Sequence, residues 1–149
     1  DVVLSPDPRP AWRRAAALVD EDVHADVAAG LAPRLALESR GTSGKNTACY
    51  YEGDLGDGRF LTVYLSTVLP YACCPVSTPG AGLLRFAMPT DDDLPGSVAT
   101  SVRDAGFVVL SLDDVMRSTR LGHASEGRAY TVWEALFEQD LDPPWEWPG

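Results

Sequence analysis

The sequence predicts a single α+β domain: a largely antiparallel β-sheet of about five or six strands, with an N-terminal helix and one or two further helices packed on it. Three observations lead to this prediction. The chain has 149 residues, the usual size of one domain, and no linker divides residues 1–149. Apolar residues recur at helical spacing near the N-terminus and alternate in the middle of the chain. The order helix, hairpin strands, helix, strand and strand is typical of an α+β domain.

The first predicted element is an N-terminal helix. Residues 1–10 contain three prolines, which favour an extended lead-in. From Ala11 to about Ala29, apolar side chains recur every three or four residues and therefore share one stripe of a helix. Gly30 then supplies a C-terminal stop, and Pro33 prevents the helix from continuing.

Strands follow this helix. Leu35 and Leu37 begin an alternation of two that predicts a first strand, and the turn residues 41–46 join it to a second strand at 47–52, so a hairpin is expected. The run 59–69 is the most strand-like part of the chain. One of its faces is wholly aliphatic, which predicts a central strand of an antiparallel sheet.

A long loop is expected at 70–82, because prolines and glycines are frequent there, and residues 83–88 are a further strand. A second helix should start after Asp93, which can cap it, with Pro95 in its first turn. Gly106 ends this helix.

The remaining segments are shorter. Residues 107–112 form an apolar run that predicts a short strand, and 113–119 follow as one or two helical turns, with Asp113 and Asp114 in capping positions. Aromatic and β-branched residues in 128–137 favour a strand, and a helix is left open as the alternative.

The net charge restricts the choice of partner. There are 22 acidic and 12 basic residues, giving a formal charge of −10. Nucleic acids and anionic membranes attract Lys and Arg, so neither is expected as a partner, and a basic protein is favoured. The alternative is that the charge serves solubility alone.

The predicted localisation rests on the apolar runs, the N-terminal pattern and the number of cysteines. No apolar run reaches the length of a transmembrane helix, and the N-terminus lacks the pattern of a signal peptide, although a chain that opens on Asp1 leaves a removed leader open. Three cysteines are an odd number and do not suggest a disulfide scaffold. These features predict a cytoplasmic protein. The absence of Ile and the abundance of Arg, Ala, Gly and Pro are typical of GC-rich codons, and indicate a bacterial source.

No metal and no cofactor are expected. Cys73 and Cys74 are neighbours, so on an extended chain their side chains point to opposite sides and cannot hold one ion. Asp54, Asp57 and the run 91–93 do not match a calcium loop, and turn or cap duty is the expected role of these acids.

One enzymatic interpretation stays open. Cys73 or Cys74 could act as a nucleophile with His123 as the base, oriented by Glu126. The alternative for both cysteines is that they behave as small buried hydrophobes. At most one of the two is expected to be a site residue, with the other facing the core.

The C-terminal segment 139–149 is the most unusual stretch, being acidic and rich in Trp and Pro. As a display surface it would bind a basic protein through rigid aromatic rings surrounded by acids. The predicted contact residues are Glu138, Asp140, Asp142, Trp145, Glu146 and Trp147. The alternatives are a segment strapped over the core and a disordered tail.

Together these observations predict a non-catalytic protein-binding module. With two His and one Lys, the chain offers few groups for catalysis. Size and charge resemble those of acidic inhibitors of the immunity type, which cover a basic partner such as a bacterial toxin. A separate expectation concerns His24: Asp20 lies one helical turn earlier, so the two side chains are expected to form a local pair on the helix. A ligand pocket between helix and sheet is a third possibility, indicated by Tyr50, Tyr51, Tyr64 and Tyr71.

Overall fold

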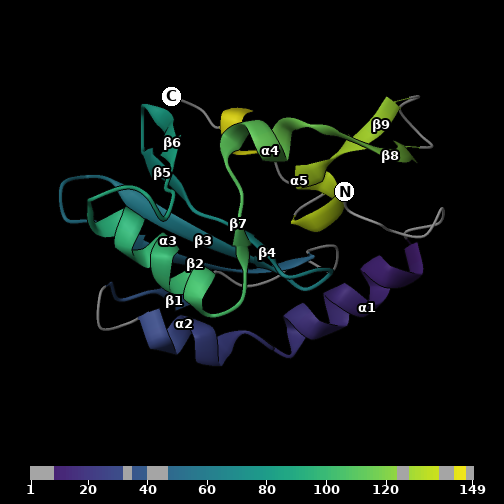
Figure 1. Ribbon diagram of the computed structural model, residues 1–149, viewed down its shortest axis with the longest axis horizontal. Coiled ribbons are helices and arrows are strands. Elements are labelled where there is room, and N and C mark those ends of the chain that lie inside the picture. Colours follow the sequence, from purple (N-terminus) through teal and green to yellow (C-terminus); the bar gives the residue numbers. More distant parts are fainter. Residues whose placement is uncertain (1–8, 32–34, 40–46, 124–127, 138–142, 147–149) are drawn as a thin grey trace.

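The computed structural model describes residues 9–31, 35–39, 47–123, 128–137 and 143–146 (Figure 1). Its helices are α1 (Arg9–Asp20), α2 (Ala25–Leu31), α3 (Leu94–Asp104), α4 (Leu112–Met116), α5 (Val132–Leu136) and the short 3-10 helix η1 (Pro144–Glu146). Its strands are β1 (Glu38–Ser39), β2 (Ala48–Asp54), β3 (Phe60–Ser66), β4 (Tyr71–Cys73), β5 (Pro75–Thr78), β6 (Gly82–Phe86), β7 (Val108–Val109), β8 (Ser118–His123) and β9 (Arg128–Thr131).

The predicted fold class is confirmed. Within the described residues, the main sheet has seven strands in the order β1-β2-β3-β4-β7, and β5 pairs with both β3 and β6. Every pairing in this sheet is antiparallel except that of β4 with β7. Strand β3 contacts β2, β4 and β5, so the run 59–69 is central as predicted. Strands β8 and β9 form a separate hairpin.

Both faces of the sheet are buried, each in its own core. The first core joins the aliphatic face of β3, represented by Leu61 and Leu65, to α2 and α3. The second core joins the opposite face, where Tyr64 lies, to α4 and α5. In Figure 1 α4 and α5 lie above the sheet, and α1 and α2 lie below it. The central strand is therefore covered on two sides, which its half-polar alternation did not indicate.

The predicted single helix from Ala11 to Ala29 is wrong, because the chain breaks between α1 and α2. Asp22 lies in this break with φ 49°, a left-handed conformation that Asp tolerates better than most residues. Its carboxylate accepts a hydrogen bond of 2.5 Å from the Tyr51 hydroxyl, which ties the turn to β2. Gly30 does not end the helix either, since α2 continues to the buried Leu31.

The other end of the lead-in also differs from the prediction. Helix α1 begins at Arg9, so the last two residues of the segment 1–10 are helical, and the rest lies outside the described residues. Pro10 is compatible with this start, because the first turn of a helix does not use its backbone N–H groups.

The predicted loop 70–82 is wrong, because it contains β4 and β5. Their pairing is long-range: Cys73 lies opposite Tyr64, and Val76 lies opposite Leu61. Pro75 opens β5, and the first residue of a strand is one of the places where proline is tolerated. Prolines here separate two short strands and do not exclude them.

The predicted second helix is confirmed as α3, with the Asp93 side chain accepting a hydrogen bond of 3.1 Å from the Gly96 N–H. Helix α4 begins one residue earlier than expected, and its cap is Ser111, which exchanges hydrogen bonds with Asp114 in a capping box. The range 128–137 contains both predicted alternatives in turn, the strand β9 and then α5. None of the described helices combines the length and hydropathy that crossing a membrane requires.

Candidate functional site

Two of the predicted contact residues lie in the described part of the C-terminal segment. Trp145 and Glu146 belong to η1, where the Trp145 ring is half-buried and Glu146 is exposed. The Trp145 ring meets that of Trp133 edge to face, with centroids 6.3 Å apart. The other predicted contacts, Glu138, Asp140, Asp142 and Trp147, lie outside the described residues. The described part of the segment is thus a turn anchored on the second core by its tryptophan.

Strand β6 lies beside η1 and carries an exposed apolar side chain. Ser77 pairs with Leu83 and Val76 with Arg85, which leaves Leu84 as the extra residue of a β-bulge. The Leu84 side chain is 48% exposed. We call the surface formed by Leu84, Trp145 and Glu146 the β6–η1 edge. Sequence reasoning missed Leu84, since only the register of β5 and β6 turns it outward.

The candidate nucleophiles are buried on opposite faces of the sheet. Cys73 lies in the second core and Cys74 in the first, and both are 0% exposed. Their opposite orientation is as predicted, but the idea that one might be a site residue gains no support. Burial raises the pKa of the Cys73 thiol, and it raises that of Cys74 to about 12. The backbone of His123 lies in β8, and its side chain is outside the described set.

We expect Cys73 and Cys74 to resist iodoacetamide in the native protein at pH 7 to 8.5, because the thiols are protonated and closed to solvent. The unfolded chain in urea should alkylate fully. Mass spectrometry of timed samples measures both. Rapid labelling of either residue in the folded protein would contradict the burial.

The same burial predicts how stability depends on pH. The ordinary thiol pKa is 9.0, so unfolded thiols ionise above it while Cys74 stays protonated in the folded protein until about pH 12. The unfolded state then binds fewer protons, and the free energy of unfolding falls as pH rises from 9 to 12. Urea unfolding at several pH values checks this. A Cys74→Ala variant should lose part of the dependence.

A polar cluster at the turn between α1 and α2 was missed from the sequence. The Tyr51 hydroxyl bonds Asp22, and Cys49 is buried nearby. Burial and the hydrogen bond to Asp22 raise the pKa of Tyr51. The His24 Nε2 atom lies 3.0 Å from the Ser66 carbonyl oxygen, a contact with β3 that the sequence did not predict. That oxygen only accepts, so Nε2 carries the proton, and the cluster fastens the turn to the sheet.

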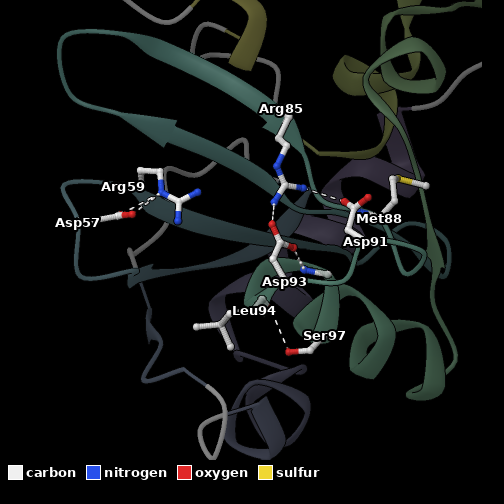
Figure 2. Close-up of polar contacts among 9 residues, drawn as sticks. Asp57, Arg59, Arg85, Met88, Asp91, Asp93, Leu94 and Ser97 are labelled. Carbon is white, nitrogen blue, oxygen red and sulfur yellow. Dashed lines mark hydrogen bonds and ion pairs between the residues drawn. The ribbon is translucent and has the colours of Figure 1, made fainter.

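A second cluster surrounds the start of α3 (Figure 2). The Arg85 guanidinium donates to Asp91 at 2.7 Å and also to Asp93. Asp91 accepts in addition from the backbone N–H of Met88 at 2.8 Å. The Arg59 side chain makes its own ion pair with Asp57 at 2.9 Å. Asp93 caps α3, as the sequence predicted, whereas the ion pairs of Asp57, Asp91 and Asp93 with arginines were not predicted.

No group of three or more His, Cys, Asp or Glu side chains suited to a metal ion occurs in the part of the chain that the structure describes. Comparisons with protein-family models, with curated proteins and with solved structures give no match to this chain. The fold places this chain in the class of mixed α+β proteins. Its β6–η1 edge carries an exposed apolar residue, Leu84, and an exposed acid, Glu146.

Proposed function

We propose that this chain is a non-catalytic protein-binding module, an acidic inhibitor of the immunity type that covers a basic partner such as a bacterial toxin. Its contact residues are those of the β6–η1 edge, together with the residues expected from the sequence alone: Glu138, Asp140, Asp142 and Trp147. The proposal places it in the bacterial cytoplasm, where its thiols remain reduced.

The observation that carries the proposal is that an exposed leucine and an exposed acid lie on two neighbouring elements, β6 and η1. Leu84 projects from a bulge, and Glu146 is exposed on the neighbouring η1. An apolar residue within an acidic rim is the arrangement by which one protein docks on a basic surface. The net charge of −10 would accelerate encounter with such a partner.

Burial of Cys73 and Cys74 argues against the alternative of a cysteine-dependent enzyme, which requires a thiolate that a substrate can reach. Near α3, Asp91 and Asp93 are engaged, because Arg85 binds both. Glu146 has no such partner among the described residues, so its charge is available to a second protein.

The experiment begins with the protein that the wild-type chain captures from a lysate of its source organism, which is identified and purified and is expected to be basic. Leu84→Asp should weaken its binding by about ten- to a hundredfold, because it places a charge in the apolar contact. Glu146→Arg should mainly slow association, most strongly at low salt.

The matched control is Asp104→Arg, which makes the same charge reversal on an exposed residue of α3. It should bind almost as the wild type does. The proposal fails if both edge variants keep wild-type affinity, or if the captured protein is acidic.

A further inference from the structure

The C-terminal end of α5 is fixed by hydrogen-bond donors from three other parts of the chain. The Trp12 indole N–H, on α1, donates to the Ala135 carbonyl oxygen at 3.0 Å. The Ser66 hydroxyl, at the end of β3, donates to the carbonyl oxygen of Leu136 at 2.7 Å. The backbone N–H of Thr47, just before β2, donates to the carbonyl oxygen that follows, at 3.2 Å. We call these three donor residues the α5 anchor.

A helix as short as α5 depends on such contacts for its position. It has only five residues, and so short a helix is not stable by itself in water. Its last carbonyl groups find no donor within the helix, so donors elsewhere decide where this end lies. Ala135 and Leu136 are both buried, so water does not replace those donors. The position of α5 therefore depends on the anchor.

Trp12 restrains the other end of α5 as well. Its ring meets that of Tyr130 edge to face, with centroids 4.9 Å apart. Tyr130 immediately precedes Thr131, which is the N-cap of α5. One side chain of α1 thus contacts the chain on both sides of the short helix.

Helix α5 in turn supports η1. The Trp145 ring rests edge to face on that of Trp133, a residue of α5, with centroids 6.3 Å apart. Because Trp145 and Glu146 share the three-residue η1, a shift of α5 moves the ring on which both depend. In Figure 1 α1 and β6 lie at opposite ends of the view. Trp12 therefore acts on the β6–η1 edge through α5.

We propose that Trp12 and Ser66 are positioning residues, which hold the β6–η1 edge in its binding geometry by fixing α5. This inference rests on the proposed function, which makes that edge the contact surface. Without these donors α5 and η1 occupy more than one position, and only molecules with Trp145 and Glu146 beside Leu84 bind the partner. The apparent affinity falls in proportion to the fraction of such molecules.

Trp12→Phe tests the proposal, since it keeps a ring beside Tyr130 and removes the donor. In the ¹H–¹⁵N spectrum of the free chain, the Trp145 indole signal, assigned with Trp145→Phe, should move from its wild-type position. Affinity for the purified partner should fall about three- to tenfold, the effect of losing one hydrogen bond. Ser66→Ala should have the same two effects, and it decides the matter if Trp12→Phe fails to fold.

Thr67→Val is the matched control. The Thr67 hydroxyl also ties α1 to the sheet, because it donates to the Ala15 carbonyl oxygen at 2.9 Å, but it makes no bond to α5. This variant should keep the wild-type Trp145 signal and the wild-type affinity. Effects as large as those of Trp12→Phe would mean that the attachment of α1, and not the α5 anchor, places the edge.

A Trp145 signal that stays in place in both Trp12→Phe and Ser66→Ala would overturn the proposal. Unchanged partner affinity would do the same, even with lower stability, since a purely structural role predicts that result. Failure of the proposed function looks different, because the wild-type chain then captures no basic partner. The spectra of the free chain still decide in that case whether the anchor holds η1.

Discussion

Replacing Trp133 with alanine should lower the free energy of unfolding by about 3–5 kcal/mol, the range for deleting a large buried aromatic side chain. The residue is 1% exposed and contacts the rings of Tyr64, Phe137 and Trp145. Its loss leaves a cavity where the central strand meets α5, and neither element can close over the space without moving the other. Urea unfolding followed by circular dichroism measures the change.

Two controls bracket this prediction. Trp145→Ala removes a half-buried ring that packs on the same second core, and it should lower the free energy of unfolding clearly less than Trp133→Ala does. Met116→Ala removes a side chain from an exposed residue and should change stability by less than about 0.5 kcal/mol. If Trp133→Ala were as mild as Met116→Ala, the second core could not have the packing described.

Gly96→Ala should be the other severe change, with a loss of about 3 kcal/mol, at the upper end of the range for inserting a methyl into a filled space. A Cβ at this position would lie 2.1 Å from the Asp91 carbonyl oxygen. The obstacle is backbone, and Asp91 is itself fixed by Arg85 and by the Met88 N–H. The first turn of α3 therefore has to move away from the loop that caps it.

Gly30→Ala is the matched control, because Gly30 lies inside α2 and a Cβ there meets nothing within 4 Å. Alanine favours a helix over glycine by about 1 kcal/mol, so this variant should be more stable than the wild type. Thermal unfolding of the two variants side by side measures the difference. A Gly96→Ala protein as stable as Gly30→Ala would contradict the close approach of Asp91 to α3.

The elements that could be predicted are those specified by neighbouring residues. Helix α3 is an example, since Asp93, Pro95 and Gly106 mark its two ends within the segment itself. The alternation of β3 was equally local. Likewise, Cys73 and Cys74 were expected to point to opposite sides because they are neighbours on an extended chain, but this says nothing of what lies on each side, and here both sides are core.

The elements that were missed depend on distant contacts. The break before α2 is associated with the hydrogen bond from Tyr51 to Asp22, between residues 29 positions apart, while the apolar stripe continues through both helices. Strands β4 and β5 form because their backbones pair with β3, and pairing overrides the local preference of prolines for a loop. Glycine and proline frequencies carry no information about such partners.

The candidate site was predictable only in part. The tryptophans and acids of the C-terminal segment were conspicuous in the sequence, and Glu146 is exposed as a contact residue requires. Leu84 was read as an ordinary strand residue, because its exposure depends on a one-residue shift in register between β5 and β6.

Hydrogen–deuterium exchange of the wild-type chain, free and bound to its purified partner, tests the central claim most directly. Binding at the β6–η1 edge predicts slower exchange in peptides that cover Gly82–Phe86 and Pro144–Glu146, with little change in the β8–β9 hairpin. Protection of the hairpin or of α3, with β6 and η1 exchanging as in the free protein, would place the contact elsewhere and contradict the proposed surface.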